Sequence, residues 1–240
     1  MDLVRLLIFD LDNTLINYGG LTQKAWQLTC ERLINSYQLD LDANKLANEI
    51  VAVNNLIWED ESKRPKGNFS FNELRTSIVT KALQNLNIEN EEIVNYLVNQ
   101  YSKCKHEVIY VFEDVEVTLK KLKKRGYLIA LLTNGDSAFQ REKLQRFDLE
   151  KLFDGIFIDG EQGVGKPEKR AYFNVLNYFK VSPNQACMIG DHFLWEVIAP
   201  KKYGLKAIWV NRGNLGVQSD EDTQADAAVS YTHLTLPTKA

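Results

Sequence analysis

The stretch "LLIFDLDNTL", Leu6–Leu15, places two aspartates, Asp10 and Asp12, directly after a run of apolar residues. An apolar run of this length without alternation is typical of a strand that is buried on both faces of a parallel sheet. Two carboxylates this close repel each other, and carboxylates are rarely buried without a partner. The pair is therefore either a solvated turn or a site that holds something positively charged.

Four further apolar runs have the same character, and helical patterns separate them. The predicted strands span residues 4–11, 127–134, 155–160, 186–191 and 206–211, and the predicted helices span residues 114–126, 137–148, 168–180 and 194–204. This alternation predicts an α/β fold with a doubly wound, Rossmann-like parallel sheet. Pro200 lies inside the last helical pattern and predicts a kink or an early end of that helix.

Residues 17–111 separate the first two predicted strands, and this segment is far longer than an ordinary connection between a strand and a helix. It contains helical patterns and no clear strand. We therefore expect an inserted all-helical subdomain at 17–111 and an α/β core made of residues 1–16 and 112–228. Residues 229–240 look like the translation of a cloning adapter, and we expect them to form a non-native tail.

The composition is typical of a soluble globular protein, with 45% hydrophobic residues, 25% charged residues and a net charge of −3. The chain has no overall excess of basic residues that would predict nucleic-acid binding. No apolar run approaches the roughly 20 residues that span a membrane. The N-terminus has no signal-peptide pattern. Cys30, Cys104 and Cys187 are far apart and odd in number, which suggests reduced thiols in a cytoplasmic protein rather than disulfides or a zinc site.

Polar residues follow four of the predicted strands, at the edge of the sheet where ligands bind in folds of this kind. In chain order they are Asp10 and Asp12, then Thr133, Asn134 and Gly135, then Lys166, and finally Asp191 and Glu196. Carboxylates bind a hard cation such as Mg²⁺, whereas a hydroxyl, a lysine and backbone amides bind an anion. A cation and an anion held together predict phosphate chemistry.

Each feature has a simpler explanation when it is taken alone. "DLDNT" and "TNGD" could be polar turns, and Lys166-Pro167 could be an exposed helix start. Their occurrence together, at successive strand ends, favours a site. "GEQGVGKP", Gly160–Pro167, nearly matches the phosphate-binding loop G-x-x-x-x-G-K-[ST], but Pro167 offers no hydroxyl for Mg²⁺ and the acidic residues would stay unexplained.

The four motifs "DLDNT", "LLTNG", the lysine of "GKP" and "IGDHFLWE" resemble those of the haloacid dehalogenase (HAD) superfamily. The inserted helical segment resembles the helical cap of that family. "TNGDSAFQREKL" is most similar to the branch that contains pyrimidine nucleotidases, phosphoglycolate phosphatases and N-acylneuraminate phosphatases. The resemblance implies a Mg²⁺-dependent phosphoric monoester hydrolase that acts on a small phosphorylated metabolite, as a monomer or homodimer, without nucleic-acid or membrane partners.

The resemblance also implies a role for each residue. Asp10 would be the nucleophile that forms an aspartyl-phosphate intermediate, and Asp12 would be the general acid and then the base. Thr133, Asn134 and Gly135 would bind the phosphate together with Lys166, which would also neutralise Asp10. Mg²⁺ would be held by Asp10, the backbone carbonyl of Asp12, Asp191 and, directly or through water, Glu196.

Other functions use the same fold. A hydrolytic 2-haloacid dehalogenase attacks carbon, needs no metal and needs no acid at Asp12, so Asp12 and Asp191 argue against it. A phosphomutase uses both aspartates of the first motif and stays open as an alternative. A non-enzymatic binding protein is disfavoured because the catalytic positions look intact. The fourth motif departs from the family in having Glu196 where an aspartate is usual.

Overall fold

The computed structural model describes residues 4–59, 71–212 and 226–229. The chain forms two compact units, a core unit made of Met1–Asn17 with Tyr110–Ala240 and a helical unit made of Tyr18–Ile109. Val229, the first residue of the predicted non-native tail, lies in the last strand of the sheet. The rest of that predicted tail, residues 230–240, lies outside the described residues.

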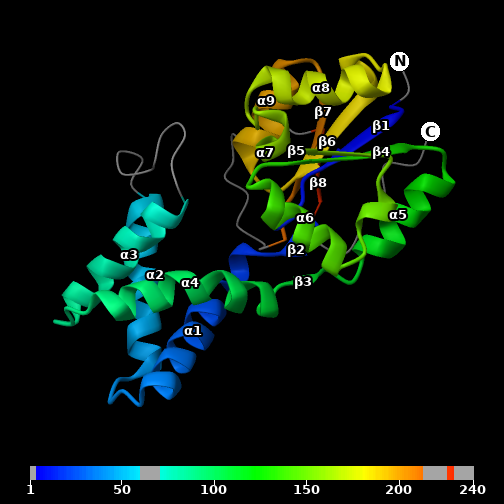
Figure 1. Cartoon of the computed structure of the whole chain (residues 1–240). Coiled ribbons are helices and arrows are strands. Elements are labelled where there is room, and N and C mark those ends of the chain that lie inside the picture. Colours follow the sequence, from blue (N-terminus) through cyan, green and yellow to red (C-terminus); the bar gives the residue numbers. More distant parts are fainter. Residues whose placement is uncertain (1–3, 60–70, 213–225, 230–240) are drawn as a thin grey trace. The chain divides into compact units, whose positions relative to one another are not determined.

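The core unit is built on a six-stranded parallel sheet with the strand order β5-β4-β1-β6-β7-β8 (Figure 1). The strands are β1 (Leu6–Phe9), β4 (Leu128–Thr133), β5 (Gly155–Ile158), β6 (Ala186–Gly190), β7 (Lys206–Val210) and β8 (Ala227–Val229). The first five confirm the strands predicted from apolar runs, whereas β8 has no predicted counterpart. Every residue of β1 and β6 is buried, which explains why these strands are apolar without alternation.

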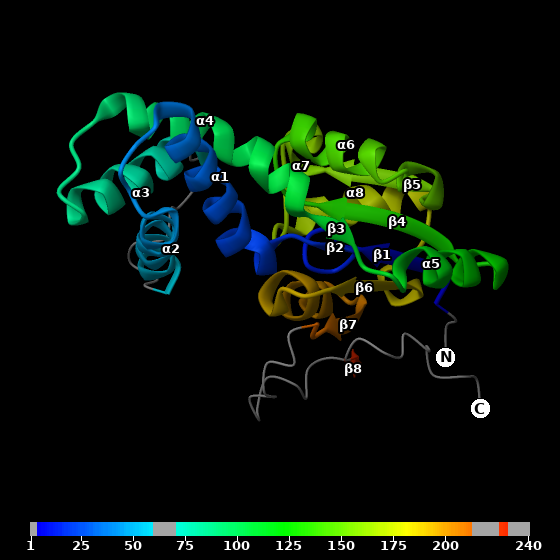
Figure 2. The same ribbon diagram turned by 90° about the horizontal axis from the view of Figure 1, so that it is seen from below.

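Helices cover both faces of this sheet, which confirms the doubly wound α/β prediction. Figure 1 shows α5 (Val115–Lys124) and α6 (Ser137–Arg146) on one face and α8 (Lys169–Phe179) and α9 (Ala199–Lys202) on the other. Figure 2 views the core from the side of α5 and α6, with α8 behind the sheet. The short elements η2 (Glu150–Leu152), α7 (Asp159–Gln162) and η3 (Pro183–Gln185) complete the connections.

The direction of winding reverses between β1 and β6. The chain runs from β1 to β4 and β5 on one side and then returns to β6, β7 and β8 on the other. In open sheets of this kind, ligands bind outside the carboxyl ends of the strands beside such a reversal. The topology therefore predicts a ligand site at the carboxyl ends of β1, β4 and β6.

The helix predicted over residues 194–204 changes type along its length. A π-helical turn, η4 (Phe193–Ile198), follows β6 after two intervening residues, and α9 continues from it without a gap. Ile198 and Ala199 both have right-handed helical backbone angles, and Pro200 lies in the first turn of α9. The change from π-helical to α-helical geometry therefore comes before Pro200, and a kink at the proline stays a prediction.

The helical unit contains η1 (Gly19–Leu21), α1 (Thr22–Tyr37), α2 (Ala43–Glu59), α3 (Phe71–Asn85) and α4 (Glu91–Val108). The apolar faces of its four α-helices form one buried cluster, in which Trp26 stacks on Tyr101 with ring centroids 4.0 Å apart. The Asn90 side chain caps α4 by accepting hydrogen bonds from the backbone N–H groups of Glu92 and Ile93. Every regular element of this unit among the described residues is a helix, but the unit is shorter at both ends than the predicted insertion 17–111, because Asn17, Tyr110 and Val111 lie in strands.

Two short strands have no counterpart in the sequence prediction. β2 (Ile16–Asn17) and β3 (Tyr110–Val111) pair in antiparallel fashion where the chain leaves the core unit and returns to it. The Asn17 side-chain amide also donates to the Tyr110 hydroxyl over 2.8 Å. Strands of two residues are too short to leave a periodic pattern in a sequence.

All three cysteines are buried and carry free thiols, in keeping with the prediction of reduced cysteines. Within the part of the chain that the structure describes, no helix combines the length and apolar character that crossing a bilayer needs.

Candidate active site

The carboxyl end of β1 places Asp10 between two neighbouring strands. The backbone N–H of Asp10 donates to the carbonyl of Ile189 over 2.9 Å, which extends the pairing of β1 with β6 by one residue. The chain then turns sharply after Asp12, with Asn13 at a φ of 61°. Asparagine tolerates this left-handed region better than most residues. Asp10 is left 7% exposed at the end of the strand.

A buried lysine neutralises Asp10. The Lys166 Nζ lies 2.6 Å from Asp10 Oδ1 and 2.6 Å from Glu196 Oε1, and the Lys166 side chain is 1% exposed. Burial by itself lowers the pKa of Lys166, but the charges of Asp10 and Glu196 outweigh it and raise the pKa above its usual value. Lys166 is therefore an ammonium that contacts two carboxyl groups.

The side chain of Asn134 holds the backbone of Lys166 on both sides. Asn134 Oδ1 accepts from the Lys166 N–H over 2.8 Å, and Asn134 Nδ2 donates to the Lys166 carbonyl over 2.7 Å. The N–H of Gly135, a predicted phosphate-binding residue, donates to Asp159 Oδ1 over 2.7 Å. The end of β4 and the loop that follows β5 are thus tied together through hydrogen bonds that the sequence analysis did not predict.

Glu196 reaches Lys166 because the π-helical turn η4 brings it back over Gly190. A Cβ added at Gly190 would lie 2.2 Å from Glu196 Cγ and 3.0 Å from Asp10 Cβ, so this position requires glycine. Glu196 is 1% exposed, and its Oε2 has no hydrogen-bond partner among the described residues. Burial raises the pKa of Glu196 to about 8; Lys166 opposes this shift, whereas the charges of Asp10 and Asp191 add to it.

Two hydrogen bonds hold the backbone of Asp191 in place. Its N–H donates to the Thr14 hydroxyl over 3.1 Å, and its carbonyl accepts from the indole N–H of Trp209 over 2.9 Å. Burial and the charge of Asp10 raise the pKa of the Asp191 carboxyl to about 7, against the effect of Lys166. Thr14 and Trp209 are positioning residues that the sequence analysis missed.

Asp12 contacts two residues of α6 to which the sequence analysis gave no role. Lys143 Nζ lies 2.8 Å from each carboxylate oxygen of Asp12. Gln140 Nε2 lies 3.2 Å from Asp12 Oδ2, 2.7 Å from Thr133 Oγ1 and 2.9 Å from the carbonyl of Asn134. The sequence signal that could have identified Gln140 and Lys143 is their spacing. Residues three apart in a helix share one face, and α6 begins directly after "TNGD".

The charges of the site fit a divalent cation. Asp10, Asp191 and Glu196 carry three negative charges when ionised, and Lys166 carries one positive charge, which gives −3 + 1 = −2. Among the described residues, no three His, Cys, Asp or Glu side chains are grouped so that they alone hold a metal ion. Mg²⁺ commonly takes one or two carboxylates and completes its shell with other oxygens and water, so Asp10 and Asp191 are suitable ligands.

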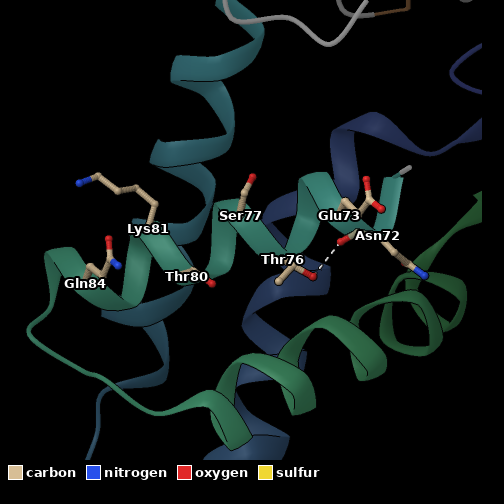
Figure 3. A pocket seen from close by; sticks show the side chains of 7 residues that line it. All are labelled: Asn72, Glu73, Thr76, Ser77, Thr80, Lys81 and Gln84. Carbon is tan, nitrogen blue, oxygen red and sulfur yellow. Dashed lines mark hydrogen bonds between the residues drawn. The ribbon is translucent and has the colours of Figure 1, made fainter. Parts of the chain in front are cut away.

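A hollow of about 490 Å³ lies elsewhere, along the exposed side of α3 in the helical unit (Figure 3). It is lined by Asn72, Glu73, Thr76, Ser77, Thr80, Lys81 and Gln84. Figure 3 shows that all of these side chains come from one helix, and Thr76 donates to the backbone carbonyl of Asn72. A catalytic site needs groups that converge from several elements, so the strand ends remain the better candidate.

The fold and the site together define an α/β protein with a doubly wound parallel sheet and an aspartate directly after its first strand. The chain belongs to the haloacid dehalogenase-like hydrolase family, whose model matches residues 4–204. This match confirms the family that the four sequence motifs predict.

Relatives of known name are similar along most of the chain. It is 29% identical over 211 residues to a glyceraldehyde 3-phosphate phosphatase of Pyrococcus furiosus, covering 88% of this chain and 82% of that protein. It is 28% identical over 215 residues to the human N-acylneuraminate-9-phosphatase, covering 88% and 84%. The magnesium-bound structure of the HAD hydrolase YfnB from Bacillus subtilis has a TM-score of 0.73 at 20% identity, covering 95% of both chains, which shows a shared fold.

Proposed function

We propose that this chain is a Mg²⁺-dependent phosphatase that hydrolyses a small phosphomonoester metabolite. The observation that carries the proposal is the Lys166 ammonium 2.6 Å from the Asp10 carboxylate. A carboxylate that attacks a phosphate must overcome repulsion between two anions, and a fixed, buried cation beside them reduces that repulsion. The names of the two phosphatases that resemble the chain support the same reaction.

The reaction divides into two steps. Asp10 attacks phosphorus, the bond from phosphorus to the leaving oxygen breaks, and Asp12 gives that oxygen a proton. Asp12 then takes a proton from a water molecule, which attacks the aspartyl-phosphate and releases inorganic phosphate. The Thr133 hydroxyl and the Asn134 N–H bind phosphate oxygens, while Gly135 shapes the turn with a φ of 132°.

Asp10, the backbone carbonyl of Asp12 and Asp191 would hold Mg²⁺, and the bound ion would polarise a phosphoryl oxygen as a Lewis acid. One oxygen of Glu196 is engaged by Lys166. Glu196 therefore acts on the site mainly by holding Lys166, and its other oxygen is left to accept from a water.

The first test compares two products. Purified protein is given para-nitrophenyl phosphate with and without Mg²⁺ and, in parallel, 2-chloropropionate. We expect Mg²⁺-dependent release of phosphate and no release of chloride. Chloride release without metal would establish a dehalogenase instead, and transfer of the phosphoryl group to a second substrate hydroxyl rather than to water would establish a phosphomutase.

The second test locates the nucleophile. Asp10→Asn should abolish turnover, because an amide is not a competent nucleophile, and rapid quenching of the wild type with labelled substrate should find the label on Asp10. Asp148→Asn is a matched control, since Asp148 is exposed and pairs with Lys151. A stable label on a serine or a histidine would refute the aspartyl-phosphate mechanism.

A further inference from the structure

Lys143 and Gln140 have no part in the reaction as proposed, although both contact its acid–base residue. The Lys143 side chain is 5% exposed, whereas the Asp12 side chain is 26% exposed. Gln140 is 2% exposed. Two polar side chains of one helix are thus buried against a carboxylate that itself reaches solvent.

The contact with Lys143 differs from an ordinary surface ion pair. Exposed pairs contribute little, because water screens them and both side chains lose rotamer freedom. A lysine buried in the core unit is unfavourable unless its ammonium is satisfied, so an apolar residue would suit a merely structural position better. The equal distances of 2.8 Å from Nζ to both oxygens of Asp12 show that both oxygens face the same ammonium, which restrains the direction of that carboxylate.

Gln140 connects the Asp12 carboxylate with the residues at the end of β4 that are predicted to bind phosphate. Its Nε2 is within hydrogen-bond distance of Asp12 Oδ2, Thr133 Oγ1 and the Asn134 carbonyl. Gly135 leaves room for this arrangement, because a Cβ there would lie 3.3 Å from three atoms of the Gln140 side chain. The positions of the Asp12 carboxyl and the Thr133 hydroxyl are therefore set by one common group.

We propose that Lys143 and Gln140 are positioning residues that hold the Asp12 carboxyl in the orientation for proton exchange. This inference rests on the proposed phosphatase function. Asp12 directly precedes a turn and is partly exposed, so without these contacts its side chain has other rotamers to occupy. The proton moves from Asp12 to the leaving oxygen and from water back to Asp12, and Lys143 keeps its own protons throughout.

The main variant is Lys143→Met, which keeps the aliphatic stem and removes the ammonium. Lys143→Arg keeps the cation, and Gln140→Met removes the amide at similar length. Lys123→Met is the matched control: Lys123 pairs with Asp154 over 2.9 Å, and Asp154 accepts from the N–H of Ile129. Ile129 lies near the amino end of β4, so this pair is at the edge of the sheet opposite to the site.

We expect Lys143→Met to lower kcat for alkyl phosphates by about 10–100-fold, the usual effect of a slightly misplaced reacting group. The loss should be smaller for para-nitrophenyl phosphate, whose leaving group needs less protonation. KM and the Mg²⁺ concentration for half-maximal activity should change by less than about twofold, because ground-state binding is untouched. Lys143→Arg should recover part of the loss, Gln140→Met should show the same leaving-group dependence, and Lys123→Met should behave as wild type.

A double-mutant cycle completes the test. In an Asp12→Ala background, Lys143→Met should cause no further loss of kcat. A further loss there, or equal losses for both leaving groups, would show that Lys143 does not act through Asp12. Activity of Lys143→Met at or above the wild-type level would overturn the inference alone. Absence of wild-type phosphate release would overturn the phosphatase function and the inference with it. If Lys143→Met does not fold, Gln140→Met and Lys143→Arg decide by the same criteria.

Discussion

Replacing Glu196 by glutamine should stabilise the metal-free protein at neutral and alkaline pH. Burial raises the pKa of Glu196 from 4.5 to about 8, with Lys166 opposing and Asp10 and Asp191 adding to the shift. Between those two values the folded protein binds more protons than the unfolded chain. The free energy of unfolding of the wild type therefore falls as the pH rises through this window. The contribution of Glu196 is fully present below pH 4.5 and is lost as the pH approaches about 8.

The size of the effect follows from the two pKa values. One pH unit within the window corresponds to about 1.36 kcal/mol. The interval from 4.5 to about 8 therefore corresponds to at most on the order of 5 kcal/mol by pH 8, shared by Glu196 and the charged groups that titrate with it. Glutamine has nearly the same size and cannot ionise, so Glu196→Gln avoids this loss. Its Tm should exceed that of the wild type by on the order of 10 °C at pH 8 and by far less at pH 5.

The assay is thermal unfolding of both proteins from pH 5 to 8.5 in the presence of a chelator. Glu161→Gln is the control, because hydrogen bonds from Arg141 lower the pKa of Glu161 and its effect should have the opposite sign. A wild-type Tm that stays level or rises between pH 5 and 8 would refute the reasoning. So would a lower Tm for Glu196→Gln at pH 8, because the ion pair with Lys166 would then stabilise more than burial destabilises.

Three further outcomes can be checked with the same protein. Gly190→Ala should displace Glu196, whose Cγ would be 2.2 Å from the new Cβ, and should lower the free energy of unfolding by about 1–3 kcal/mol together with the activity. Asp191→Ala should remove activity and Mg²⁺ dependence together, with loss of Mg²⁺ binding measured by calorimetry. Added Mg²⁺ should raise the wild-type Tm more at pH 8 than at pH 6, because the metal binds ionised carboxylates.

The apolar runs predicted the strands because both faces of the sheet are covered. A strand such as β6 is buried at every residue, so its side chains on both faces of the sheet are apolar. Parallel topology brings the carboxyl ends of these strands to one edge of the sheet, so the polar residues that follow them can be predicted as a set. Asp10 and Lys166 belong to that set, and the structure places them in contact.

The contacts within that set could not be predicted from the same pattern. Glu196 faces Lys166 because η4 is a π-helical turn over Gly190, and a π-helical turn has no sequence period of its own. Lys143 stands in the polar sequence "QREKLQR" and looks like a surface charge. Its burial depends on the face that α6 turns toward Asp12, which is a property of tertiary packing.

The Asn134 side chain forms its two hydrogen bonds to Lys166 with the backbone N–H and carbonyl of that residue, and not with its side chain. Cutting away the lysine side chain, as in Lys166→Ala, should therefore leave the loop in place and open a hole next to two carboxylates. A small primary amine from solution would suit this space, because the group it replaces is itself a primary ammonium between Asp10 and Glu196. Methylammonium or ethylammonium should then restore part of the lost turnover in a saturable manner, so that the cation becomes an exchangeable component of the enzyme whose size and basicity can be varied one at a time.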